Sequence, residues 1–304
     1  MSTPLTTVRK TSPGINVAGR LSDYLEMTKP RISVMVLVTV TVGYALGSFG
    51  GWEPRTLLHA LVGIALVATA SSALNQVLER RTDALMARTQ SRPLPSGRLS
   101  TREVTTFGMA CVTIGTIWLV SFVNVTTAAL TLLTFLLYVL VYTPLKQRSH
   151  ICTAIGAIPG ALPPVLGWVA ADAPLDVRPL ALFGILFLWQ FPHFLAIAFM
   201  YRDEYRRAGL KMLPGNNVPR IVGWMAVCYA VLLIPVSLIP STVGLAGSGY
   251  AAAAIVLGLG YLVASIRFLR DESQQTARAV VLTSLVYLPV LLFALVGEHF
   301  SLLQ

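Results

Sequence analysis

Three oxygen-bearing side chains, Asn75, Glu79 and Asp83, follow one another at intervals of four residues. On a helix this spacing places them close to one face, so their oxygen atoms point the same way. Arginines follow within a few turns, at Arg80, Arg81, Arg88 and Arg92. Carboxylates that can hold a divalent cation, with arginines beside them, suit a phosphorylated substrate. The same residues also fit a loop at the inner membrane surface whose acids simply pair with its arginines.

A second acidic pair, Asp203 and Glu204, follows another apolar segment, and Lys146 and Lys211 lie near the ends of apolar segments. Hard oxygen ligands suit Mg²⁺, which usually joins one or two carboxylates to substrate phosphates. The predicted Mg²⁺ ligands are Asn75, Glu79, Asp83, Asp203 and Glu204. The cations predicted to neutralise a diphosphate and stabilise it as a leaving group are Arg88, Arg92, Lys146 and Lys211.

The composition indicates what kind of protein must position these side chains. Of 304 residues, 55% are hydrophobic and only 12% are charged, which is far more apolar than a soluble domain. Long apolar runs recur, so the chain is predicted to cross a lipid bilayer several times. The net charge of +10 would suggest nucleic acid for a soluble chain. Here membrane topology accounts for it, and we expect no nucleic-acid partner.

Nine spanning segments are expected, at residues 32–49, 56–78, 104–122, 125–144, 151–170, 179–200, 220–240, 248–266 and 279–297. If the N-terminus is cytoplasmic, all of the 23 Lys and Arg residues except Arg55 and Arg178 fall on the cytoplasmic side. This bias predicts a cytoplasmic N-terminus and an extracytoplasmic C-terminus. Both acidic groups then lie at the cytoplasmic face.

Two domain-level expectations follow. Residues 1–28 are predicted to be a polar cytoplasmic segment, and residues 29–304 a single nine-helix intramembrane domain. The N-terminus has no apolar stretch before a small-residue cleavage site, so no secretory signal peptide is expected. The predicted location is the bacterial inner (cytoplasmic) membrane, crossed many times.

The fifth segment, residues 151–170, carries an unusual number of glycines and prolines: Gly156, Pro159, Gly160, Pro163, Pro164 and Gly167. Broken backbone at membrane depth is tolerated where it is buried in protein or lines a cavity. Two interpretations therefore stay open, a wall of an internal cavity and a kinked, tightly packed helix. An apolar cavity under a cap of acids and cations would suit a lipid chain with a diphosphate head. No P-loop, HExxH motif or Ser/His/Asp spacing supports a hydrolase or an ATPase.

Several stretches resemble a known family. The first is Asn75-x3-Glu79-x3-Asp83, followed by Met86, Arg88-Thr89 and Arg92-Pro93-Leu94-x2-Gly97. Others are Thr28-Lys29-Pro30-Arg31, Tyr142-Thr143-Pro144-Leu145-Lys146, Gly156 through Trp168, Trp189-Gln190-x-Pro192-His193-Phe194 and Tyr205-x2-Ala208-Gly209-x2-Met212-Leu213-Pro214. Together they resemble the UbiA-type intramembrane prenyltransferase superfamily, and most closely its heme-directed branch.

That resemblance implies an all-α membrane protein with nine transmembrane helices bundled around a central cavity with a cytoplasmic cap. It implies Mg²⁺ as cofactor and farnesyl diphosphate and heme b as substrates. The farnesyl group would pass to a heme vinyl group, and water would add to give heme O. The implied catalytic residues are Asn75, Glu79, Asp83 and Glu204. Heme A synthase and oxidase assembly factors are candidate partners.

One departure and three alternatives bear on this interpretation. The wider superfamily has a second Asp-x3-Asp motif, whereas here the residues four after Asp203 and Glu204 are Arg207 and Ala208. The heme-directed branch resembles this chain in that respect. His193 is a candidate heme contact, since imidazole binds iron, but it equally suits a structural hydrogen bond. The alternative functions are transfer to another acceptor, such as an aromatic acid or another tetrapyrrole, and ion-coupled transport.

Overall fold

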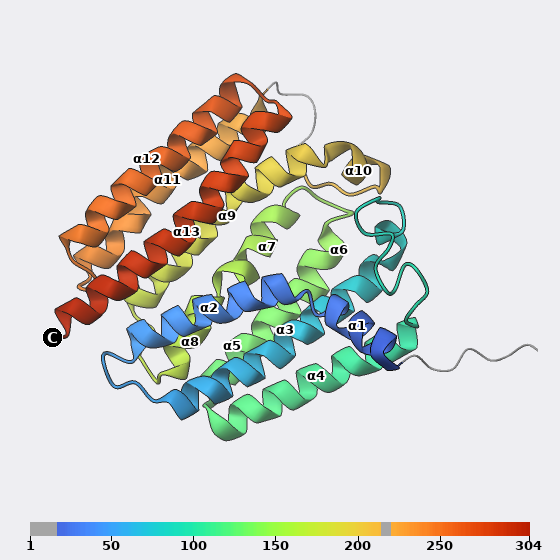
Figure 1. Cartoon of the computed structure of the whole chain (residues 1–304), viewed down its shortest axis with the longest axis horizontal. Coiled ribbons are helices and arrows are strands. Elements are labelled where there is room, and N and C mark those ends of the chain that lie inside the picture. The colour runs from blue at the N-terminus through green and yellow to red at the C-terminus, as the bar shows by residue number, and fades with distance from the viewer. Residues whose placement is uncertain (1–16, 214–219) are drawn as a thin grey trace, which may run out of the picture.

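The computed structural model describes residues 17–213 and 220–304, and every regular element within them is a helix (Figure 1). Nine stretches of this described part are long and apolar enough to cross a membrane. They are α2 (Pro30–Gly47), α3 (Pro54–Asp83), α4 (Thr101–Phe122), α5 to α6 (Val125–Leu145), α7 and α8 (Cys152–Ala170), α9 (Val177–Met200), α11 (Ile221–Thr242), α12 (Ser248–Arg270) and α13 (Gln274–Leu302). For residues 17–213 and 220–304, the predicted all-α fold with nine spanning helices is confirmed.

The helix α3 is longer than the segment 56–78 expected from the sequence, because it continues without a break to Asp83. Its 30 residues span about 45 Å, well beyond the roughly 30 Å hydrocarbon core of a bilayer. Asn75, Glu79 and Asp83 therefore stay on one helix, as their spacing predicts, and lie on its last turns.

A short helix, α1 (Val17–Met27), occupies part of the segment that was expected to be merely polar. Residues 1–16 of that predicted segment lie outside the described residues. The α1 helix buries Asp23 and Met27 against the protein. Arg98, from the connection between α3 and α4, forms ion pairs with Asp23 and Glu26. Composition alone did not reveal this helix, because the apolar residues that it buries are few.

The fourth span is not a uniform α-helix. It consists of α5 (Val125–Leu136), a π-helix (Leu137–Tyr142) and the single turn α6 (Thr143–Leu145). The carbonyl of Tyr138 accepts both the backbone N–H and, at 2.8 Å, the hydroxyl of Thr143. A π-helix shifts the residues that follow it around the helix axis, and such segments are frequent at functional sites.

The fifth span is divided at Leu162 into α7 (Cys152–Ala161) and α8 (Pro163–Ala170). Its glycines allow close helix packing. A Cβ atom on Gly167 would lie 1.8 Å from Val40 O, and one on Gly43 would lie 1.8 Å from Pro164 O. Small residues let the backbones of membrane helices approach in this way. At these positions the structure supports the interpretation of a tightly packed helix.

Figure 1 shows two groups of helices, with α10 (Arg202–Arg207) at the end of the molecule opposite the C-terminus. In one group, α11 packs on α9 and α12, and α13 packs on α9 and α12. In the other, α3 packs on α4 and α2 packs on α8. The α1 helix, the connection 84–100 and α10 all lie at the same end of the bundle, next to the last turns of α3.

The contact between α2 and α8 gives a stability prediction. We expect Gly167→Ala to lower the free energy of unfolding by about 1–3 kcal/mol, because its methyl group would collide with main chain of α2. Gly260→Ala in α12 is the matched control, since a Cβ there meets nothing within 4 Å. Thermal unfolding of both purified variants in detergent measures the difference. Equal midpoints for the two variants would contradict the packing argument.

Candidate functional site

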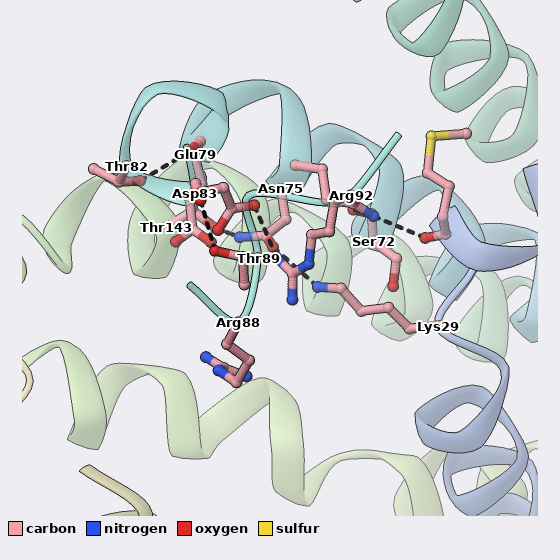
Figure 2. A network of polar contacts seen from close by, with 12 residues as sticks. Lys29, Ser72, Asn75, Glu79, Thr82, Asp83, Arg88, Thr89, Arg92 and Thr143 are labelled. Carbon is pink, nitrogen blue, oxygen red and sulfur yellow. Dashed lines mark hydrogen bonds and ion pairs between the residues drawn. The ribbon is translucent and has the colours of Figure 1, made fainter. Parts of the chain in front are cut away.

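A buried polar cluster lies at the end of α3. Asn75 and Asp83 are 1% exposed and Glu79 is 8% exposed. Ionised groups at such burial are stable only with close partners. Each of the three side chains therefore contacts a polar group from another part of the chain, and Figure 2 shows most of this network.

Asn75 joins two elements to α3. Its Oδ1 accepts a hydrogen bond from Lys29 Nζ at 3.2 Å, and its Nδ2 donates one to Thr143 Oγ1 at 3.1 Å. Thr143 directly follows the π-helix, so the shift produced by that segment brings its hydroxyl to the amide. The amide thus fixes the junction of α1 and α2 and the end of the fourth span relative to α3.

Both carboxylates of the cluster form ion pairs. Lys146 Nζ lies 2.7 Å from Glu79 Oε1, and Arg92 Nη1 lies 2.8 Å from Asp83 Oδ2. The Lys146 ammonium also lies 4.5 Å from the centre of the Tyr142 ring, at cation–π distance. The alternative of acids that pair with nearby cations is thus correct in part, but the pairs are buried rather than solvated.

Lys29 is a member of this cluster that the sequence analysis did not assign. It connects α1 to α2 with a backbone φ of +51°, an uncommon conformation for a residue other than glycine. Burial lowers the pKa of Lys29 to about 8, and repulsion from Arg92 and Lys146 adds to the effect. The cluster therefore holds three cations against two carboxylates and is suited to receive an anion. Its sequence signal was the Lys-Pro-Arg stretch at a helix start, which also fits an interface anchor.

The connection between α3 and α4 is folded rather than open. Met86, Leu94 and Leu99 are each less than 5% exposed, and Thr89 Oγ1 donates to Asp83 O at 2.8 Å. These contacts hold Arg92 beside Asp83. They also position Arg88, whose guanidinium points away from the first cluster (Figure 2).

Arg88 connects the segment next to the polar cluster of α3 with α10, the helix that carries the second acidic pair. Its guanidinium carbon lies 5.2 Å from the centre of the Tyr201 ring, and its Nη2 donates to Tyr205 Oη at 3.4 Å. Tyr205 is on α10, and burial raises the pKa of its hydroxyl, so the hydroxyl stays neutral. The two regions that were predicted to share a cytoplasmic face are thus in contact.

The two residues of the second acidic pair, Asp203 and Glu204, differ in burial and in their partners. Asp203 is mostly exposed and pairs with Arg206 at 2.9 Å within α10. Glu204 is half-buried, and its Oε2 is buried without a hydrogen-bond partner. Among the described residues, no three Asp, Glu, His or Cys side chains approach closely enough to share one metal ion. A metal site that joins both acidic groups therefore stays a prediction.

Lys211 contacts the site with its backbone rather than with its side chain. Its N–H donates to Lys146 O at 2.7 Å, and its carbonyl accepts a hydrogen bond from Cys152 Sγ at 3.6 Å. The Lys211 side chain is exposed. Its predicted contact with a diphosphate stays a prediction, whereas the backbone contact shows that it helps to hold Lys146. Pro214, the last residue of the motif that contains Lys211, lies outside the described residues.

His193 lies apart from both acidic groups, inside the membrane-spanning helix α9. Its Nδ1 is 2.7 Å from Ser284 Oγ of α13. The structural hydrogen bond that the sequence analysis weighed is therefore present. A heme contact through the other ring nitrogen stays a prediction.

Comparisons with known proteins show which family this chain is similar to. The model of the UbiA prenyltransferase family matches residues 36–295. Protoheme IX farnesyltransferase of Solibacter usitatus (strain Ellin6076) is 41% identical over 281 residues, which cover 89% of this chain and 96% of that protein. Protoheme IX farnesyltransferase of Koribacter versatilis (strain Ellin345) is 42% identical over 294 residues, which cover 92% of this chain and 94% of that protein. The resemblance inferred from the motifs is confirmed.

Solved structures of lower identity share the fold. A digeranylgeranylglyceryl phosphate synthase matches with a TM-score of 0.79 at 18% identity, over 93% of this chain and 99% of that one. A UbiA homolog from Archaeoglobus fulgidus, bound to GPP and Mg²⁺, matches with a TM-score of 0.67 at 18% identity, over 90% of this chain and 99% of that one. At such identities the likeness concerns the arrangement of the helices.

The ion pair between Glu79 and Lys146 gives a second stability prediction. We expect Lys146→Met to cost about 3 kcal/mol, because it leaves the buried Glu79 carboxylate without its cation. Adding Glu79→Gln to this variant should restore part of the loss. Denaturant unfolding in detergent of the two single variants and the double variant measures the coupling. Strictly additive effects would show that the two side chains do not interact.

Proposed function

Because this chain belongs to the UbiA prenyltransferase family, we propose that it transfers the farnesyl group of farnesyl diphosphate to a vinyl group of heme b, with addition of water, to give heme O. The names of its relatives support both substrates. The observation that carries the proposal is the buried cluster at the end of α3, where three cations face two carboxylates.

The chemistry needs a site that stabilises a departing diphosphate. The allylic C–O bond breaks, and its electron pair leaves with the diphosphate. The terminal vinyl carbon then forms a C–C bond to C1 of the farnesyl cation. Water adds to the vinyl carbon beside the porphyrin ring and loses a proton, which gives the hydroxyl group. Preorganised cations lower the barrier because the negative charge develops on the leaving group.

Three side chains of the first cluster are suited to that role. Lys29, Arg92 and Lys146 converge on α3 from three different parts of the chain. An incoming diphosphate would offset the repulsion among these cations and would compete for Arg92 and Lys146 with their carboxylate partners. Arg88 is proposed to contact the diphosphate from the side of Tyr201 and Tyr205.

The donor set fits Mg²⁺. Asn75, Glu79 and Asp83 present oxygen atoms along one helix, and Mg²⁺ needs only one or two protein carboxylates when it also binds phosphate oxygens. Glu204 Oε2 is a buried oxygen that accepts no hydrogen bond, so it is the better supported ligand of the second pair. Mg²⁺, when bound, would supply positive charge to the leaving diphosphate. Asp203, the other proposed ligand of this pair, is exposed and would have to leave its ion pair with Arg206 to bind the metal.

The proposed setting is the bacterial inner membrane, crossed by residues 29–304 as one domain after the polar segment 1–28. The distribution of Lys and Arg supports a cytoplasmic N-terminus and an extracytoplasmic C-terminus. Farnesyl diphosphate would then reach the cluster from the cytoplasm. Since heme O would be handed on within the membrane, heme A synthase and oxidase assembly factors are proposed partners.

A product assay tests the proposal. Purified protein in detergent receives heme b, farnesyl diphosphate and Mg²⁺, and mass spectrometry identifies the extracted hemes. We expect a heme that carries one hydroxyethylfarnesyl group, and we expect its formation to stop when Mg²⁺ is chelated. Unchanged heme b together with prenylation of an aromatic acid would overturn the proposed acceptor. If the hydroxyethylfarnesyl heme still forms when Mg²⁺ is chelated, the proposed role of Mg²⁺ is wrong.

The role of the first cluster is tested separately. We expect Glu79→Gln to lower the transfer rate by about 100-fold or more, because it removes a carboxylate proposed to hold Mg²⁺ beside the leaving diphosphate. Glu53→Gln is the matched control, since Glu53 lies outside the cluster, before α3, and its carboxylate accepts a hydrogen bond from the neighbouring Thr56. Both variants should insert into membranes like the wild type. Wild-type activity in Glu79→Gln would remove Glu79 from the proposed site.

A further inference from the structure

Two polar side chains, His193 and Ser284, lie in contact within the membrane-spanning helices, outside the proposed diphosphate site. Ser284 of α13 is fully buried, and His193 of α9 is half-buried. Nδ1 of His193 lies 2.7 Å from Ser284 Oγ. A polar side chain at this depth is costly, and its placement commonly marks a function.

The contacts of Ser284 determine where the imidazole proton sits. Ser284 Oγ lies 2.6 Å from Val281 O and donates its hydrogen there. A hydroxyl group has only one hydrogen, and two oxygens this close would repel each other without it. Ser284 Oγ must then accept from His193 Nδ1–H. The neutral imidazole consequently carries its free lone pair on Nε2.

One ring stacking on His193, and two hydrogen bonds that hold the stacked Trp189, keep the imidazole ring in place. The Trp189 ring stacks on His193 with centroids 5.3 Å apart and planes 18° apart. Trp189 Nε1 donates to Ser284 O at 2.9 Å, and Tyr261 Oη of α12 donates to Trp189 O at 3.0 Å. Contacts from α12 and α13 therefore hold Trp189, which stacks on the imidazole, and α13 also holds the imidazole itself through Ser284.

The position of His193 on α9 shows between which neighbouring helices its side chain lies. Gln190 donates to Ala157 O of α7 at 2.8 Å, and Trp189 donates to α13. His193 lies about 60° around the helix from Gln190 and about 40° from Trp189. It therefore lies between the faces of α9 that pack on α7 and α13, and not on the face that packs on α11.

The depth of His193 relates it to the proposed diphosphate site. Eight residues separate it from Tyr201, the ring that Arg88 contacts. At 1.5 Å per residue this is about 12 Å along the helix. A flat acceptor held at His193 would thus have one edge toward the diphosphate end of the bundle and its body in the apolar interior.

We propose that His193 Nε2 is the axial ligand of the iron in an iron porphyrin acceptor, and that Ser284 is the positioning residue that keeps Nδ1 protonated and the ring oriented. This inference rests on the proposed function and adds how the acceptor is held. Metal-ligating histidines commonly donate their second ring N–H to a fixed oxygen in this way. A hydrogen bond at Nδ1 and a free lone pair at Nε2 are what such ligation requires.

Ligation predicts a role for the iron and not only for the porphyrin ring. The iron–nitrogen bond would fix the height of the macrocycle on α9, so that its vinyl groups stay near one level in the membrane. A base that removes a proton from water during the reaction would also use Nε2, but it would leave no trace in the spectrum of bound heme. The two roles are therefore separable before any farnesyl diphosphate is added.

The test titrates purified full-length protein in detergent with ferric heme b and records the optical spectrum and the Kd. We expect the wild type to show an imidazole-ligated heme. His193→Ala should lose that spectrum and regain it on addition of free imidazole. Ser284→Ala should keep the spectrum but bind heme about tenfold more weakly, as expected when the hydrogen-bond partner of a metal-binding histidine is lost. Iron-free protoporphyrin IX should bind the wild type and His193→Ala with equal Kd, which also shows that the variant is folded.

Two control variants change residues that have no part in the proposed heme site. Ser265→Ala removes a buried serine of α12 that donates only to Tyr261 O, and His59→Ala removes a histidine stacked on Phe122. Both should bind heme like the wild type. A wild-type heme spectrum in His193→Ala, or equal losses for heme and iron-free porphyrin, would overturn the inference. If the wild type makes no heme O in the product assay but ligates heme through His193, the proposed function fails instead.

Discussion

Burial of ionised side chains at the end of α3 is the constraint to which much of this structure responds. Glu79 and Asp83 lie where solvent cannot screen them, and a buried charge without a partner costs several kcal/mol. Their partners, Lys146 and Arg92, come from separate parts of the chain. The connections that carry these partners must fold tightly, and the buried apolar residues of the 84–100 connection provide that fold.

Excess positive charge is the functional consequence of this arrangement. Lys29 adds a third cation and donates to the uncharged Asn75 rather than to a carboxylate. A cluster of this kind is stable enough to persist alone and gains further stabilisation when an anion enters. The π-helix before Thr143 and the unusual backbone of Lys29 are local departures from regular structure, and both lie at this cluster. Such departures persist where the surrounding contacts hold them and are common at functional sites.

The other helices form two groups, and the proposed donor site and acceptor site lie in different groups. The close approach of α2 and α8 through Gly43 and Gly167 gives a rigid wall next to α3. The bundle of α9, α11, α12 and α13 holds Trp189, His193 and Ser284 by side-chain hydrogen bonds at membrane depth. The proposed donor and acceptor sites would thus belong to different groups of helices, with Arg88, Tyr201 and Tyr205 in contact where the groups meet.

Sequence alone determined the nine spans, because about twenty consecutive apolar residues have no other stable setting than a bilayer or a buried core. It also placed Asn75, Glu79 and Asp83 on one face, since a spacing of four depends only on helix geometry. Only the tertiary structure showed that Lys29 belongs to the site. It also showed that Asp203 forms an ion pair with Arg206 and that Lys211 contacts Lys146 through its backbone. These outcomes depend on contacts between residues far apart in the chain. The α1 helix also depends on such contacts, because Arg98, from the connection after α3, pairs with its Asp23 and Glu26.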